Sequence, residues 1–134
     1  MTTQTRRLTY EEYLKTPEIK ARYDILDGMM TMAPAPTVIH QRILFRLARF
    51  LDQFVSEQQL GEVLIAPVDV IIGREPLRTR QPDLLFVSNE HTSILIDQVD
   101  GAPDLVAEIL SPSNTRSDLG AKLSDYAALG VLEC

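Results

Sequence analysis

Apolar residues recur at steps of three and four in two segments of the chain, and this period predicts two amphipathic helices. The longer helix is expected to begin after a Thr37 cap and to end at Gly61. Its apolar face is formed by Ile39, Ile43, Leu47, Phe50, Leu51 and Phe54. The shorter helix is expected from about Ser117 to Leu129, with Gly130 closing it. We expect the apolar side of each helix to face the core.

Two local signals predict short elements near the start of the chain. Thr9 and Glu12 have the spacing of a capping box, in which each side chain accepts a backbone hydrogen bond from the other residue. A helix is therefore expected at Tyr10–Lys15. Asp27-Gly28 readily adopts the positive φ values of a tight turn, so the apolar runs on either side predict a β-hairpin over residues 23–32.

Extended, β-rich runs fill the middle of the chain. They are Glu62–Ala66, continuing as Val68–Ile72, and then, after a polar connection from Gly73 to Pro82, Leu84–Val87 and Leu105–Leu110. The last two runs show little polar alternation, which is typical of strands buried on both faces. The order helix, hairpin, helix, strands, helix predicts a mixed central sheet flanked by helices, an α/β or α+β fold.

Composition and charge narrow the class of protein. The chain has 134 residues, which predicts a single domain over residues 1–134, and its net charge of −6 argues against a general charge-driven grip on nucleic acid. Arg42, Arg46 and Arg49 could still form a local phosphate-binding stripe, or simply a solvated helix face. A single cysteine, a polar start and no apolar run of membrane-spanning length predict a cytoplasmic protein with no membrane partner.

Two acidic residues stand in segments that otherwise have the character of core. Asp83 opens the apolar run Leu84–Val87, and Glu108 interrupts Leu105–Leu110. A buried carboxylate costs several kcal/mol unless it has a cation, hydrogen bonds or an exposed strand end. Two acids on neighbouring strands are sufficient to hold Mg²⁺ together with waters and phosphate oxygens. The residues alone leave both a metal site and ordinary strand-end hydrogen bonding open.

Several strings of the sequence carry a family resemblance. They are Tyr23-Asp-Ile-Leu-Asp-Gly28, Met32-Ala-Pro-Ala-Pro36, His40-Gln41, Gln81-Pro-Asp-Leu-Leu-Phe-Val-Ser88 and Gly101-Ala-Pro-Asp-Leu-Val-Ala-Glu-Ile-Leu-Ser-Pro-Ser113, followed by Asp118, Lys122 and Tyr126. In this combination the chain resembles the Uma-two family of endonucleases, in the PD-(D/E)XK superfamily. The resemblance implies a restriction-endonuclease-like fold and a metal-dependent endonuclease that hydrolyses phosphodiester bonds of DNA. A degenerate member of this fold that only binds nucleic acid or protein is the alternative.

The resemblance also assigns roles to the central site residues. It implies that Asp83 and Glu108 bind Mg²⁺ or Mn²⁺ at the ends of adjacent strands. The superfamily places a lysine two residues after the glutamate, where this chain has Leu110. Lys122 is the replacement that the resemblance implies, with its charge orienting the attacking water or stabilising the transition state. An ion pair with Asp118, four residues earlier, is the structural alternative for Lys122.

Two more site residues and an expected assembly complete this interpretation. Asp24 stands where the family usually has glutamate, and His40 is implied to hydrogen-bond a substrate phosphate or a carboxylate. The family pattern continues past residue 133 with further strands, so we expect this chain to lack the C-terminal strands of the family. The apolar surface left uncovered would favour a homodimer, a symmetry that suits the cutting of two strands.

Overall fold

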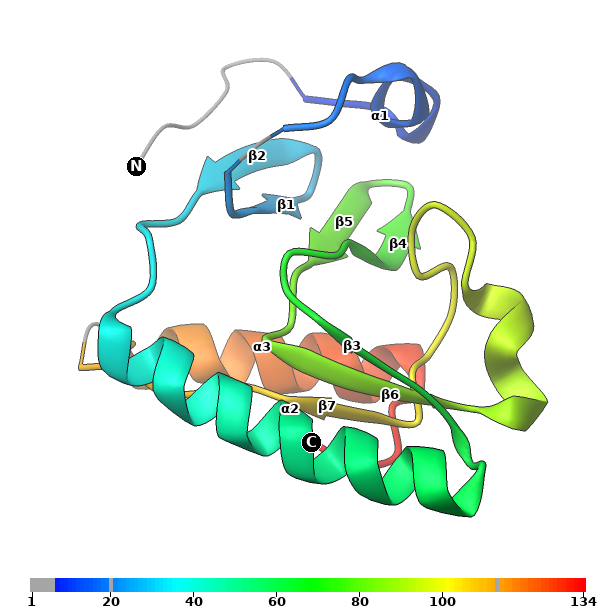
Figure 1. Cartoon of the computed structure of the whole chain (residues 1–134). Coiled ribbons are helices and arrows are strands. Elements are labelled where there is room, and N and C mark those ends of the chain that lie inside the picture. The colour runs from blue at the N-terminus through cyan, green and yellow to red at the C-terminus, as the bar shows by residue number, and fades with distance from the viewer. Residues whose placement is uncertain (1–6, 20, 113) are drawn as a thin grey trace.

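The computed structural model describes residues 7–19, 21–112 and 114–134 (Figure 1). The first six residues, which contain the polar start used to predict a cytoplasmic protein, lie outside this described part, as do Lys20 and Ser113. The helices are α1 (Tyr10–Lys15), α2 (Val38–Gln58), the 3-10 helix η1 (Asn89–Ile94) and α3 (Arg116–Leu129). The strands are β1 (Tyr23–Leu26), β2 (Met29–Met32), β3 (Gly61–Ile65), β4 (Val70–Arg74), β5 (Leu77–Arg80), β6 (Leu84–Ser88) and β7 (Leu105–Ala107). The predicted α+β class is confirmed.

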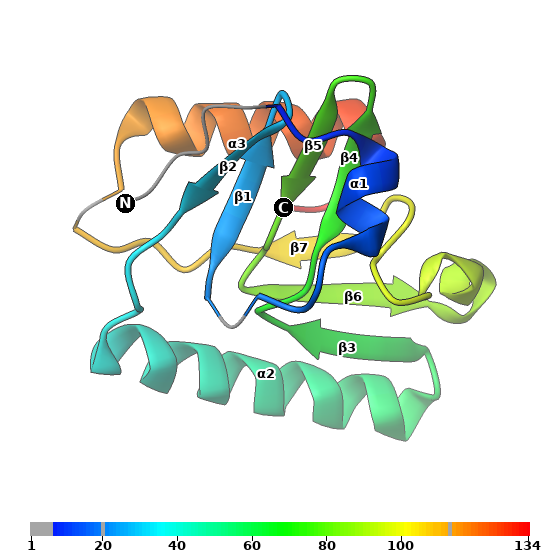
Figure 2. The ribbon, with the colours of Figure 1, turned by 90° about the horizontal axis from the view of Figure 1, so that it is seen from above.

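The strands form two sheets, with the orders β2-β1-β5-β4 and β3-β6-β7. Neighbouring strands pair antiparallel in both sheets. Within the described ranges, parallel pairing is limited to isolated bridges such as Leu105 with Glu133. Helix α2 runs beside β3 on one side of the three-stranded sheet, and α3 lies on the other side (Figures 1 and 2). The strands of the expected central sheet are thus divided between two antiparallel sheets.

The local signals in the sequence are confirmed. Thr9 Oγ1 accepts a hydrogen bond from the Glu12 backbone at 3.1 Å, and Glu12 Oε1 accepts one from the Thr9 backbone at 3.2 Å, so the capping box of α1 is complete. At the hairpin turn, Asp27 and Gly28 take φ values of 52° and 83°. Two consecutive left-handed residues produce the tight turn that matches the twist of β1 and β2.

Three strand predictions are wrong in detail. The run expected to pass from Glu62–Ala66 into Val68–Ile72 is broken, because β3 and β4 belong to different sheets. The polar connection from Gly73 to Pro82 contains the whole of β5. The last strand ends at Ala107, so Glu108 lies just past its end and not within it.

The long helix α2 begins as predicted, because Thr37 Oγ1 accepts a hydrogen bond from the His40 backbone at 3.2 Å. It ends at Gln58 instead of Gly61, and Gln59 takes the left-handed cap with φ 53°. The expected packing of its apolar face is also wrong. Five of its six predicted side chains are exposed, with exposed fractions from 39% to 75%: Ile39, Ile43, Leu47, Phe50 and Phe54. We call these five the α2 apolar stripe; the helix is anchored instead by the buried His40, Leu44 and Val55.

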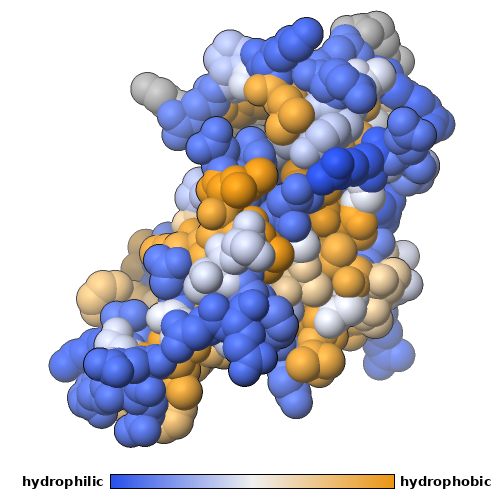
Figure 3. Space-filling model, turned by 90° about the vertical axis from the view of Figure 1, so that its right-hand side faces the viewer, coloured by the Kyte–Doolittle hydropathy of each residue, from blue (hydrophilic) through white to orange (hydrophobic). Residues whose placement is uncertain are grey.

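Two groups of buried apolar side chains form the core. The first lies between α1 and the four-stranded sheet and contains Tyr13, Tyr23, Ile25, Met30, Ile71 and Leu77. The second lies between the sheets and α3 and contains Val70, Leu85, Val87, Val99, Val106 and Tyr126. Hydrophobic side chains also reach the surface in several patches, as on the side that carries η1 (Figure 3). In the described part of the chain, no helix is long and apolar enough to cross a membrane.

Candidate active site

Asp83 and Glu108 occupy matching positions on two paired strands. Asp83 immediately precedes β6, Glu108 immediately follows β7, and the strand register pairs Leu84 with Ala107. The ladder ends at this pair, and continuing its register by one step would set Asp83 opposite Glu108. Both residues line one pocket of about 390 Å³.

Asp83 is only 2% exposed and is surrounded by donors. Its Oδ1 lies 3.1 Å from Arg22 Nη2 and 3.2 Å from His40 Nε2. Its Oδ2 accepts a hydrogen bond from the Ile109 backbone at 2.7 Å. Because an unpaired buried carboxylate is costly, these contacts explain how Asp83 is tolerated at the head of an apolar strand.

Helix α2 positions His40 in the pocket. The imidazole lies in the first turn, where the Thr37 cap fixes the direction of the helix, and it is one of the few buried residues of α2. His40 Nδ1 contacts Gln41 Oε1 at 2.9 Å, while Nε2 faces Asp83. The imidazole is therefore oriented from both ring nitrogens, and it contacts a carboxylate as the sequence interpretation implied.

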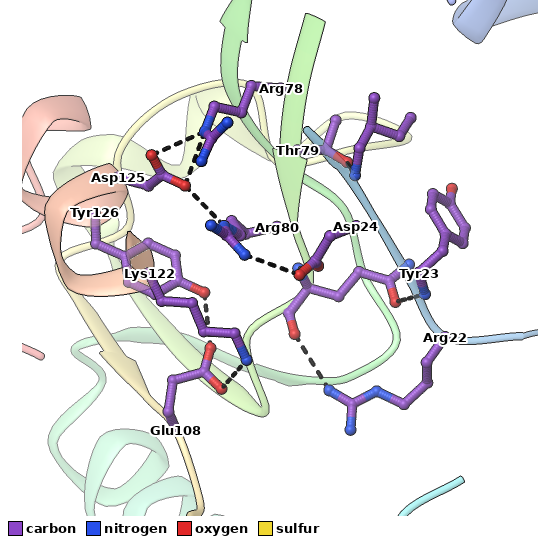
Figure 4. A network of polar contacts seen from close by, with 12 residues as sticks. Arg22, Tyr23, Asp24, Arg78, Thr79, Arg80, Glu108, Lys122, Asp125 and Tyr126 are labelled. Atoms are coloured by element: carbon purple, nitrogen blue, oxygen red, sulfur yellow. Dashed lines mark hydrogen bonds and ion pairs between the residues drawn. The ribbon is translucent and has the colours of Figure 1, made fainter. Parts of the chain in front are cut away.

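Glu108 is held by two side chains from α3. Tyr126 donates its hydroxyl hydrogen bond to Glu108 Oε1 at 2.7 Å, and Lys122 Nζ lies 3.6 Å from Oε2 (Figure 4). Residues four apart on a helix share one face, which brings both onto the same carboxylate. Burial raises the pKa of Glu108 above its usual value, although Lys122 and Tyr126 oppose this shift. The charges of Asp83 and Asp24 add to the increase in its pKa.

Lys122 lines the pocket and pairs with Glu108. The alternative ion pair with Asp118 does not occur between these two described residues, whereas Asp118 itself also lines the pocket. A cation from α3 thus lies beside the glutamate, although the position two residues after the glutamate holds Leu110.

Asp24 lies on β1, and its carboxylate contacts residues at the end of β5. Its Oδ2 is 3.0 Å from Arg80 Nη1, and its Oδ1 accepts the Gln81 backbone hydrogen bond at 3.2 Å. Arg80 in turn pairs with Asp125 of α3 at 2.7 Å, and Asp125 also binds Arg78 at 2.9 Å (Figure 4). Asp24 lines the pocket, but its carboxylate is part of an ionic network that joins β1, β5 and α3.

All five predicted site residues therefore line one pocket: Asp24, His40, Asp83, Glu108 and Lys122. Sequence reasoning missed Arg22, Arg80 and Asp125. Arg22 stands directly before the Tyr23-Asp-Ile-Leu string, and Arg80 directly before the Gln81-Pro-Asp string. A basic residue two or three positions before a candidate acidic residue was therefore the available signal for both.

The mixed α+β fold is the one expected for a restriction-endonuclease-like protein. A family model described as "Putative restriction endonuclease" (Uma2) matches residues 10–134, so the chain belongs to the Uma2 family. The fold resembles a crystal structure titled as a putative nuclease belonging to DUF820 from Anabaena variabilis ATCC 29413. The TM-score is 0.77 at 19% sequence identity, over 92% of this chain and 70% of that chain. No curated protein matches the sequence.

Family membership confirms the resemblance inferred from the sequence and supports a nuclease-like function. Restriction-endonuclease-like families are typically metal-dependent, so the side chains of the pocket can be compared with the ligands that a metal ion requires. Among the described residues, no group of three or more His, Cys, Asp or Glu side chains is arranged to hold an ion. Mg²⁺ needs only one or two carboxylates, with waters and phosphate oxygens completing its shell. Asp83 and Glu108 satisfy that minimum with oxygen ligands, so the residues fit Mg²⁺ or Mn²⁺.

Proposed function

We propose that this protein is an endonuclease that hydrolyses phosphodiester bonds of DNA and depends on Mg²⁺ or Mn²⁺ held by Asp83 and Glu108. The observation that carries the proposal is the position of these two carboxylates at the same end of β6 and β7, facing one pocket. Neighbouring ionised carboxylates repel each other, which favours a divalent cation between them. The bound ion would polarise the phosphodiester and lower the pKa of an attacking water.

The remaining pocket residues supply positioning and charge. Lys122 Nζ, next to Glu108, would orient the water and stabilise the negative charge that develops on phosphate oxygens. His40 contacts Asp83 through Nε2 and lines the pocket, where it would also contact a phosphate. Asp24, already paired with Arg80, would act through the water shell of the ion and not as a direct ligand.

Metal titration tests the binding half of the proposal. We expect calorimetry with Mn²⁺ to show binding by the wild type and at least tenfold weaker binding by Asp83→Asn. Asp100→Asn removes the same charge from an exposed ion pair with Arg74, so its affinity should match the wild type. Equal affinity in Asp83→Asn and the wild type would remove Asp83 from the metal site.

Plasmid nicking tests the catalytic half. With Mn²⁺, the wild type should nick supercoiled DNA, and Glu108→Gln should not. If the wild type binds DNA without cutting it, even at high protein concentration, the alternative function is correct and the protein is a binding module. That alternative is favoured by Leu110, which stands where the superfamily has its lysine.

We also propose a homodimer in the cytoplasm. The support for the dimer is the α2 apolar stripe, whose members are spaced almost symmetrically about Leu47. In an antiparallel pairing of two copies, Ile39 would face Phe54 and Ile43 would face Phe50. From Ile39 to Phe54 the stripe extends about 22 Å along the helix, at about 1.5 Å per residue. The cytoplasmic location rests on the sequence composition alone.

A further inference from the structure

Arg22 is a pocket residue that neither the sequence motifs nor the proposed mechanism uses. It lies just before β1 and lines the pocket with Asp83 and Glu108. Its Nη2 contacts Asp83 Oδ1 at 3.1 Å and the Gln81 carbonyl oxygen at 3.3 Å. The side chain is 24% exposed, so the guanidinium reaches the pocket from a partly buried position.

The contact places a cation on the oxygen that a divalent ion would need. Asp83 Oδ2 is already bound to the Ile109 backbone, and Oδ1 is the oxygen that Arg22 and His40 share. A positive charge about 3 Å from a ligand oxygen repels a second cation approaching the same oxygen. Arg22 and the ion therefore compete for Asp83 Oδ1.

The geometry of Arg22 also indicates a second position for its side chain. Its Nε is fully buried and has no hydrogen-bond partner among the residues that the structure describes. The contact with Asp83 therefore uses only some of the N–H donors of the guanidinium. The buried Nε donor without a partner is unfavourable. Phosphate oxygens can accept from Nε and one Nη together, which is the paired geometry that arginine prefers.

We infer that Arg22 exchanges its partner when the site is loaded: it holds Asp83 before the divalent ion binds, and it then turns to a phosphate of the nucleic-acid substrate. The inference rests on the proposed function, because it requires Asp83 to be a metal ligand. In this arrangement Arg22 weakens metal binding to the free protein and strengthens binding of substrate, so ion and nucleic acid bind cooperatively.

Arg22→Met tests the competition, because it removes the charge and keeps an unbranched side chain of similar length. We expect calorimetry to show at least about tenfold tighter Mn²⁺ binding in Arg22→Met than in the wild type. Arg74→Met is the matched control, since it lowers the net charge equally but breaks the exposed pair with Asp100. Arg74→Met should bind Mn²⁺ as the wild type does.

DNA binding tests the second half of the exchange. In the presence of Ca²⁺, Arg22→Met should bind a short DNA duplex at least fivefold more weakly than Arg74→Met.

The outcomes separate this inference from the function on which it rests. If the wild type binds Mn²⁺ and Arg22→Met binds it no more tightly, the competition is wrong and the metal site stands. If neither protein binds Mn²⁺, the proposed function is wrong and the inference fails with it.

If Arg22→Met does not fold, ¹⁵N NMR of the wild type decides the question. The Arg22 Nε signal should shift on addition of Mg²⁺ while that of Arg74 does not, and an unchanged Arg22 signal would refute the exchange.

Discussion

Helix α2 borders two regions of opposite character. Its first turn directs His40 into the pocket, where buried carboxylates face cations. Another side of the same helix exposes the α2 apolar stripe to solvent. Around α2, charged side chains are thus buried in the pocket and apolar side chains are exposed, the reverse of the usual distribution.

The two departures differ in how they are compensated. The acids of the pocket have partners within the chain: Asp83 binds Arg22, Glu108 binds Lys122, and Asp24 binds Arg80. The α2 apolar stripe is covered by no described part of the chain, since its side chains are exposed. The pocket is therefore satisfied within one copy, whereas the stripe is the kind of surface that another molecule covers.

Arg80→Met should produce the largest change in stability, because it removes a cation that pairs with two acids of the ionic network. Arg80 is 4% exposed and bridges Asp24 to Asp125, so its loss leaves two partly buried carboxylates with fewer partners. We expect the free energy of unfolding in urea to fall by about 3 kcal/mol. Arg74→Met, which breaks an exposed pair, should change it by less than about 1 kcal/mol. Similar losses in both variants would mean that the buried network has no special role in stability.

A pair of α2 variants compares the anchored face with the stripe. Leu44→Ala removes a buried side chain and should lower the free energy of unfolding by about 3 kcal/mol. Phe50→Ala removes a ring that is 75% exposed and should leave the monomer within about 0.5 kcal/mol of the wild type. Light scattering after size exclusion should show a dimer for the wild type and a monomer for Phe50→Glu. A dimer that survives Phe50→Glu would place the interface elsewhere.

Lys122→Ala tests whether the second cation of the pocket is catalytic. We expect Mn²⁺ affinity no weaker than that of the wild type, because the lost charge also repels the ion, and at least about a tenfold lower nicking rate, equivalent to roughly 1.4 kcal/mol in the barrier. Lys15→Ala, on the exposed surface of α1, is the control and should nick DNA at the wild-type rate. An unchanged rate in Lys122→Ala would limit Lys122 to neutralising Glu108.

The smallest effect concerns the pH dependence of stability. Burial raises the pKa of Glu108 above 4.5, its value in the unfolded chain. Its contribution to stability is therefore complete below pH 4.5 and is lost as the pH rises through the higher folded-state pKa. Glu108→Gln cannot ionise, so it should be more stable than the wild type at pH 7. Thermal unfolding should show this gain shrinking as the pH falls and vanishing below pH 4.5, and a gain that persists below pH 4.5 would have another cause.

Much of the fold followed from signals that are local in the sequence. The capping box of α1, the Asp27-Gly28 turn and the Thr37 cap each depend on residues within a few positions of one another, and all three are confirmed. Strand β5 was missed because Leu77–Arg80 is mostly polar. Its Thr79 and Arg80 are buried by groups distant in the chain, Thr79 by the Ile25 backbone and Arg80 by Asp24 and Asp125.

The pocket and the stripe show the limit of sequence reasoning in opposite ways. Asp83 and Glu108 were identifiable because a charge within an apolar run is a local anomaly. The pairing of Asp83 with Arg22 was not identifiable, because Arg22 is 61 positions from Asp83 along the chain. The stripe has the same period as a core-facing helix surface, and periodicity alone does not reveal whether anything covers it.

The pairing of Leu84 with Ala107 has a consequence for how the molecule must fold. Because side chains alternate along a strand, a slip of a single residue between β6 and β7 would direct either Asp83 or Glu108 away from the other. Molecules with a shifted register would lose the pair of acids even if the rest of the chain were folded. Any nuclease activity would therefore report on correctly aligned molecules only.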